Sequence, residues 1–138
     1  MFTTRANRVS ALSLLAAALV ASLASSVFKL YEEFWWLDEA LHLFFTFSLT
    51  LVLALYGYGR VLTGPHRILL LLSIAGLGLA CGALWEIAEW SYDEMAGPDA
   101  IYATTNSITD MNDTMSDLIL DLAGALAAGV ASLSILRK

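Results

Sequence analysis

The sequence predicts an all-α polytopic membrane protein, a four-transmembrane-helix bundle formed by residues 1–138 as a single transmembrane domain. Composition supports this fold class, because 59% of the residues are hydrophobic and only 14% are charged. A soluble domain would carry more charge. The apolar residues also fall into four long runs, each near the roughly 20 residues that a helix needs to cross a bilayer.

Polar segments separate the four apolar runs. The first break is acidic and aromatic, and the other two contain Gly-Pro pairs, which are typical of turns. The predicted spans are residues 9–30, 40–59, 68–90 and 118–136, with an outer loop at 91–117. That loop is long for a helix–helix connection, so a lid, a short surface helix and a solvated linker are all open interpretations.

Basic residues predict the orientation of the bundle. Such residues concentrate on the cytoplasmic side of membrane proteins. Six of the seven flank the same ends of the spans: Arg5, Arg8, Arg60, Arg67, Arg137 and Lys138. We therefore expect both termini inside, the N-in/C-in arrangement. The first span resembles a secretory signal peptide, but its apolar run is longer than a usual signal core, so we expect it to be retained.

The acidic residues take the opposite side. All thirteen lie in the predicted outer segments or in the span halves that adjoin them. The net charge of −6 therefore reflects negative charge concentrated on one side of the membrane. Because this charge is acidic, we expect no nucleic-acid partner. Aromatic residues such as Trp35, Trp36 and Trp90 gather at the same outer ends, where amphipathic rings favour the headgroup level.

Carboxylates and one imidazole recur at helical spacing near the outer ends of spans two, three and four. One pair is four residues apart, another is three apart, and three aspartates of span four follow at intervals of four, so each set shares a helix face. Ionisable groups inside a membrane are costly and are functional by default. The candidate metal ligands are Asp38, His42, Glu86, Glu89, Asp113, Asp117 and Asp121.

Crowded carboxylates at low dielectric repel one another unless protons or a cation neutralise them. A divalent metal ion does so most completely, and oxygen ligands with one imidazole suit Mg²⁺, Mn²⁺, Ca²⁺, Fe²⁺ or Zn²⁺. Proton-sharing carboxylates and a solvated acidic vestibule stay open as alternatives. Taken singly, four acidic residues also fit helix starts near water, where the helix dipole favours negative charge: Asp38, Glu39, Asp113 and Asp117.

Three motifs resemble the YjdF-like family of small bacterial inner-membrane proteins, and there is a looser similarity to the VanZ-like family. They occur in matching order and are Asp38-x-x-x-His42, Glu86-x-x-Glu89-Trp90, and Asp113-Thr114-x-x-Asp117 before a Gly124-Ala125 helix. The resemblance implies a multi-pass protein of the bacterial cytoplasmic (inner) membrane with a common site. With the predicted orientation, that site faces the periplasmic or extracellular side. No particular activity is implied.

Three functions from different classes fit these patterns. The first is a metal-dependent hydrolase or transferase acting on a lipid or its headgroup, with Glu86 or Glu89 as the catalytic general base. The second is cation or proton binding or transport, which the scarcity of polar groups in the inner half opposes. The third is an accessory or assembly subunit with a structural cluster, partnered by a second copy or a membrane complex. The depth of the candidate site, near lipid headgroups, favours the first.

Overall fold

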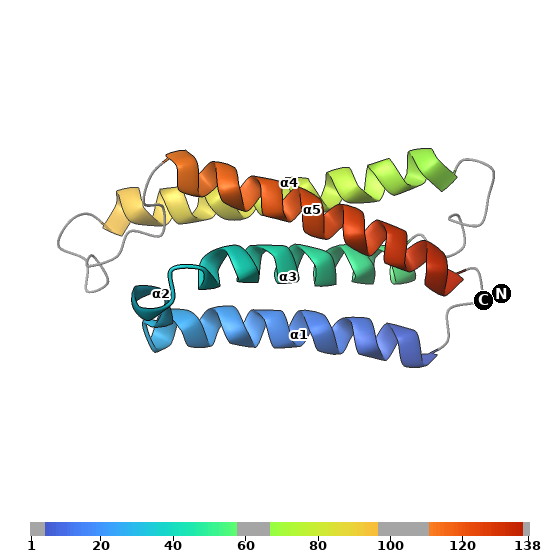
Figure 1. Ribbon diagram of the computed structural model, residues 1–138, viewed down its shortest axis with the longest axis horizontal. Coiled ribbons are helices and arrows are strands. Elements are labelled where there is room, and N and C mark those ends of the chain that lie inside the picture. Colours follow the sequence, from blue (N-terminus) through green and yellow to red (C-terminus); the bar gives the residue numbers. More distant parts are fainter. Residues whose placement is uncertain (1–4, 58–66, 97–110, 137–138) are drawn as a thin grey trace.

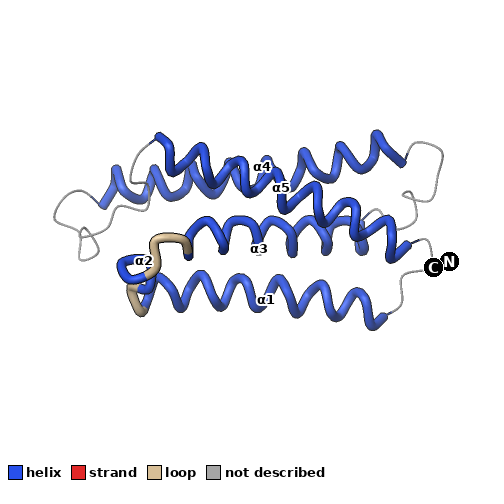
Figure 2. The backbone as a smooth tube through the Cα atoms, in the orientation of Figure 1, coloured by secondary structure: helices blue, strands red, loops and turns tan. Residues whose placement is uncertain are grey.

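The computed structural model describes residues 5–57, 67–96 and 111–136, and all secondary structure in these ranges is helical (Figure 1 and Figure 2). Four helices are long and apolar enough to cross a membrane, which confirms the predicted fold class. The elements are α1 (Arg5–Val27), α2 (Leu30–Glu33), α3 (Leu37–Val52) with a π-helical continuation (Leu53–Gly57), α4 (Arg67–Ala96) and α5 (Met111–Leu136).

The two ends of the bundle differ in which chain segments they contain. The start of α1 and the end of α5 lie at one end, while α2, the end of α4 and the start of α5 lie at the other, which we call the α2 end (Figure 1). Four helices that cross a membrane in turn place the start of α1 and the end of α5 on the same side. The side that faces the cytoplasm stays a prediction from the basic residues.

The central helix of the bundle is α3. It packs against α1, α4 and α5, and α4 and α5 also pack against each other. In the figures α1 lies on the opposite side of α3 from α4 and α5 (Figure 1). α3, α4 and α5 therefore form a mutually contacting group, and α1 packs on the other side of α3.

Apolar side chains fill the half of the bundle away from α2 and also cover its outside. The buried core there consists of Ala11, Leu51, Ala54, Leu55, Ile74 and Ala128. On the outside, large apolar residues are widely exposed, for example Val20 and Ile119 at 67% each. Such a surface is unfavourable in water and suits contact with lipid tails.

Two helices extend into the segment that was expected to be the outer loop, residues 91–117. α4 continues past Trp90 to Ala96, and α5 begins at Met111. Loss of hydropathy ends a membrane span but not a helix, and residues 91–96 contain neither Gly nor Pro before the Gly97-Pro98 break. The rest of the predicted loop, residues 97–110, lies outside the described residues, and so do the lid and linker interpretations.

The first helix ends earlier than the predicted span of residues 9–30. It stops at Val27, and Lys29 adopts a left-handed backbone conformation with φ of 54°. A left-handed residue just after a helix turns the chain away from the helix axis. The turn leads into α2, and α3 starts at Leu37.

Small residues allow close approach of the helices at two interfaces of α5. A Cβ atom on Gly78 of α4 would lie 2.9 Å from the Ala125 Cβ of α5. Gly124 of α5 faces α3, because a Cβ there would lie 2.5 Å from the Leu43 carbonyl oxygen. Neighbouring positions of a helix point to different faces, so α5 approaches α3 and α4 closely at the same depth.

Candidate metal centre

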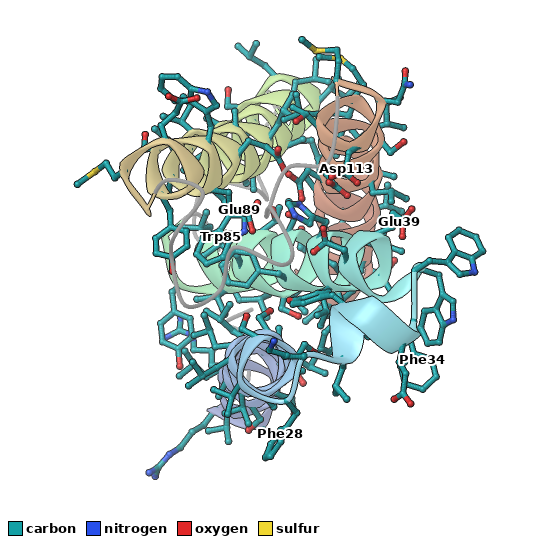
Figure 3. The ribbon with its side chains drawn as sticks, turned by 90° about the vertical axis from the view of Figure 1, so that its left-hand side faces the viewer. Phe28, Phe34, Glu39, Trp85, Glu89 and Asp113 are labelled. Carbon is teal, nitrogen blue, oxygen red and sulfur yellow. The ribbon has the colours of Figure 1, made fainter. Side chains whose placement is uncertain are left out.

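Three helices bring the predicted acidic and histidine residues together at the α2 end. α3 begins at Leu37, so Asp38 and His42 occupy its first turns on one face. α4 runs towards the same end and carries Glu86 and Glu89 in its last turns. Seen from this end, Glu89 lies between α4 and α3 (Figure 3).

Burial of the seven candidate ligands increases with distance from the α2 end. The four buried residues are His42 at 6% exposure, Glu86 at 5%, Asp117 at 2% and Asp121 at 1%. The three half-buried residues are Asp38, Glu89 and Asp113. The acidic cluster formed by all seven is therefore more accessible at the α2 end and closed at its deeper end.

Two overlapping groups of three side chains have ligand atoms close enough to hold one ion. In each group the three atoms all lie within 4.8 Å of one another, and His42 belongs to both groups. Asp38 and Asp117 complete the first group, and Glu86 and Glu89 complete the second. Three helices thus supply ligand atoms around a single imidazole.

The other two candidate ligands, Asp113 and Asp121, belong to neither group. Asp113 is half-buried one turn before Asp117. Asp121 lies one turn deeper than Asp117, with its Oδ1 atom 3.3 Å from His42 Nδ1. The other imidazole nitrogen, Nε2, lies 3.6 Å from Glu86 Oε1. Both sides of the imidazole therefore face carboxylates, one from α5 and one from α4.

Three buried carboxylate oxygens of the acidic cluster have no hydrogen-bond partner: Glu86 Oε1, Asp117 Oδ1 and Asp121 Oδ2. A buried polar group left without a partner costs about 1–3 kcal/mol, and a charged one costs more. Such groups are normally paired in proteins, and exceptions call for an explanation. Either a cation or protons would provide one here.

Thr46 belongs to the cluster although it is neither acidic nor a histidine. It is 1% exposed, and its hydroxyl donates a hydrogen bond of 2.5 Å to Asp121 Oδ1. The residue continues the spacing of Asp38 and His42 along the same face of α3. That spacing is the sequence signal for its position, and a search confined to ionisable residues misses it.

Tyr31 of α2 lies within electrostatic reach of the cluster. Burial raises the pKa of Tyr31 to about 12; the negative charges of Asp38 and Glu89 raise it as well, whereas hydrogen bonds with Ser26 and Ser25 lower it. The phenol is therefore neutral at physiological pH. It adds a hydroxyl group beside the more accessible end of the cluster, where the sequence indicates only an interfacial aromatic anchor.

Comparisons with known proteins place the chain in a family. It belongs to the DUF2238 family of predicted membrane proteins, whose family model matches residues 2–138. It is 34% identical over 116 residues to an uncharacterized protein of Thermotoga maritima, a match that covers 74% of this chain and 55% of the relative. The chain thus spans about half the length of that relative. No solved structure matches the chain. The membership is compatible with the resemblance to the YjdF-like family, and it assigns no activity.

Proposed function

We propose that this member of the DUF2238 family binds a divalent metal ion between α3, α4 and α5, and uses it to hydrolyse or transfer a group on a lipid or its headgroup. The ion would lie beside His42, which both groups of ligand atoms share. In the N-in/C-in orientation this site faces the periplasmic or extracellular side of a bacterial inner membrane.

The observation that carries the proposal is the set of buried oxygens without partners, on Glu86, Asp117 and Asp121. Several carboxylates cannot all stay charged at low dielectric without a counter-charge. A divalent ion supplies that charge and accepts several oxygen ligands at once, whereas a proton neutralises only one carboxylate. The imidazole adds a nitrogen ligand that Mn²⁺, Fe²⁺ and Zn²⁺ all accept.

The number of ligands also supports chemistry over a purely structural role. Each group offers three protein ligand atoms. Catalytic zinc sites typically use three protein ligands and leave a position for water or substrate, whereas structural sites are closed by four. A site with three ligands from the first group, Asp38, His42 and Asp117, would keep such a position open.

In that arrangement the second group supplies the base. Glu86 and Glu89 lie on the α4 side of His42, with ligand atoms within 4.8 Å of it. An ion held by the first group would polarise the substrate and a water molecule. Glu86 or Glu89 would accept a proton from the water as its oxygen attacks a phosphoryl or acyl centre, and would pass that proton to the departing alcohol of the lipid. Glu89 is half-buried and lies nearer the α2 end, which favours access from the level of lipid headgroups.

Conduction through the bundle fits the inner half poorly. Beyond the cluster, the buried residues include Leu51, Leu55 and Ile74. The hydroxyls of Ser48 and Ser73 bond to carbonyl oxygens of their own helices, so they do not line a polar path. A transport route needs polar groups along its length. The described residues therefore favour a site that is closed on its deeper side.

The test is metal analysis of the detergent-purified protein. We expect near-stoichiometric metal in the wild type after washing, or saturable Mn²⁺ binding by equilibrium dialysis if the native ion is weakly held. Asp117→Asn keeps the side-chain shape and removes a charged ligand of the first group, so it should lose most of this binding. Glu86→Gln changes the proposed base and should keep it. The matched control is Glu94→Gln, which changes an exposed acid of α4 outside the cluster and should bind metal as the wild type does.

Absence of saturable metal binding by the wild type would overturn the proposal in favour of carboxylates that share protons. Binding without activity would separate the two parts of the proposal. Activity is measured by incubating the metal-loaded protein with mixed phospholipid vesicles and analysing the lipid products by mass spectrometry. Glu86→Gln serves as the inactive reference in that assay.

A further inference from the structure

Asp121 differs from the other acids of the cluster in what surrounds it. At 1% exposure it is the most buried of the seven candidate ligands. Its Oδ1 atom accepts the hydrogen bond from the Thr46 hydroxyl and lies 3.3 Å from His42 Nδ1. One oxygen of this carboxylate is therefore already engaged with two side chains of α3.

The other oxygen of Asp121 is directed at α4. A Cβ atom placed on Gly82 would overlap with Asp121 Oδ2, so the carboxylate occupies the space that any larger residue at position 82 would need. Gly82 itself is buried. The absence of a side chain on α4 is thus the condition for Asp121 to reach His42 between the two helices.

Resting on the metal site proposed above, we propose that Asp121 is a positioning residue for His42 and that Gly82 admits it to that place. Nδ1–H of His42 donates to Asp121 Oδ1, which leaves the Nε2 lone pair for the metal. Nε2 is the nitrogen that lies 3.6 Å from Glu86 Oε1, on the side of α4. Histidine ligands of metals commonly donate their second N–H to a carboxylate, which sets the tautomer and the ring orientation.

This role explains why Asp121 belongs to neither group of converging ligand atoms although it touches the shared histidine. It also gives Thr46 a function. The Thr46 hydroxyl donates a hydrogen bond to the Asp121 carboxylate and so fixes the position of the group that orients the His42 imidazole. The sequence pattern alone places Asp121 in one stripe with Asp113 and Asp117. Contacts across the helix interfaces separate them.

Co²⁺ titration of the full-length protein in detergent tests the inference, because the visible spectrum of Co²⁺ reports its ligands. We expect Asp121→Asn to bind one Co²⁺ with the band positions of the wild type and an affinity about 10–100-fold weaker, the range for partners of metal-bound histidines. His42→Gln removes a ligand and should change the bands or abolish binding. In Zn²⁺-loaded wild type, ¹⁵N NMR should show His42 protonated at Nδ1.

Gly82→Ala is the second variant, with Gly76→Ala as its control, because a Cβ on Gly76 would meet nothing within 4 Å. We expect Gly82→Ala to weaken Co²⁺ binding as Asp121→Asn does, and Gly76→Ala to leave it unchanged. In an Asp121→Ala background the overlap with the carboxylate is absent and only the contact with the Cβ at position 121, at 3.0 Å, is left, so adding Gly82→Ala should weaken Co²⁺ binding much less than in the wild type. If Gly82→Ala does not fold, Asp121→Asn still decides.

The outcomes separate this inference from the function on which it rests. Wild type that binds no Co²⁺ overturns the proposed function and this role together. Wild type that binds Co²⁺, combined with altered bands or complete loss in Asp121→Asn, shows that Asp121 is a ligand and overturns this inference alone. Protonation of His42 at Nε2 in the Zn²⁺ form, or equal affinities of Asp121→Asn and wild type, overturns it as well.

Discussion

The group formed by α3, α4 and α5 has two halves that use the same helices differently. Towards α2 its interior is polar and centred on His42 and Asp121, while towards the other end it is apolar, with Leu55, Ile74 and Ala128 at 0% exposure. Lipid tails are as apolar as leucine, so the apolar half gains from close packing and not from escape out of water. The polar half provides partners that lipid cannot offer, which makes it the half where a specific site can form.

Two threonines of α3 mark the boundary between the halves. Thr46 donates to Asp121, whereas Thr50, one turn deeper, has a buried hydroxyl without a partner and lies against Gly78. Beyond Thr50 the buried side chains are those of the apolar core and Ser132, whose hydroxyl donates to the Gly129 carbonyl oxygen of its own helix. Among the described residues, the buried ionisable side chains therefore lie only on the α2 side of this boundary, where neighbouring helices supply hydrogen-bond donors and further ligand atoms.

The largest expected effect comes from placing a carboxylate in the apolar half. Ala128→Asp introduces one about two turns below Asp121 on the same helix, where the neighbours are apolar. We expect the free energy of unfolding to fall by about 3 kcal/mol more than in Ala128→Val, the cost of a charged residue at the centre of a membrane helix. Ala128→Val controls for the added volume, which by itself costs about 1–3 kcal/mol.

Denaturation in mild detergent, followed by tryptophan fluorescence, measures this difference. If Ala128→Asp and Ala128→Val were equally stable, the apolar half would tolerate charge as the polar half does. The distinction between the two halves would then be lost.

An intermediate effect of opposite sign is expected in the polar half. Asp117→Asn removes one acid from a group of mutually repelling carboxylates, so without metal we expect the free energy of unfolding to rise by on the order of 1 kcal/mol. With Mn²⁺ at 100 times its dissociation constant the wild type should become more stable than Asp117→Asn, because binding raises the free energy of unfolding of the wild type by ~2.7 kcal/mol. The same denaturation assay, with and without Mn²⁺, measures both states.

Glu94→Gln is the control for this reversal and should change stability in neither state. Destabilisation of metal-free Asp117→Asn would contradict the expectation. It would mean that the Asp117 carboxylate accepts bonds on which the fold depends.

The smallest expected effect is a change in the pKa of Tyr31 when a charge is removed from the acidic cluster. Because the charge of Asp38 is among the causes that raise the pKa of Tyr31 to about 12, Asp38→Asn should lower that pKa. Burial is the larger cause, so we expect a change of less than about one pH unit. Tyrosinate absorbance, with Tyr31→Phe subtracted, measures it, and an unchanged pKa would show that Tyr31 lies outside the field.

The sign of the accompanying stability change follows from the raised pKa. Since the folded protein favours the neutral phenol, this contribution is fully present below the ordinary tyrosine pKa near 10. It is lost as the pH rises through about 12. Asp38→Asn should lower the upper end of this pH range, because it lowers the pKa of Tyr31 in the folded protein. Glu94→Gln should leave the pH range unchanged.

Much of the fold could be predicted from local sequence properties. Hydropathy located the four membrane-spanning helices because each needs a long apolar run, whatever its neighbours are. It located the helix ends less well. α4 continues through a polar segment to Ala96, since hydrogen bonding and the absence of Gly or Pro decide where a helix ends.

The candidate site could be predicted as a set of residues but not as an arrangement. Spacing placed Asp38 with His42, and Glu86 with Glu89, on common helix faces, and five of the seven candidate residues have converging ligand atoms. Thr46 shares the spacing of His42, but its role depends on a contact with α5. Residues on one face of one helix can be read from periodicity, whereas contacts between helices cannot.

The sequence by itself determined four apolar helices and the concentration of acidic residues at one end of the bundle, because hydropathy and helical periodicity are local properties. Only the tertiary structure decided that both His42 nitrogens face carboxylates, that Gly82 makes room for Asp121, and that Gly124 faces α3 and not α4. Those contacts depend on how far each helix is rotated and shifted against its neighbours, and close packing of small residues between distant parts of the chain sets that rotation and shift.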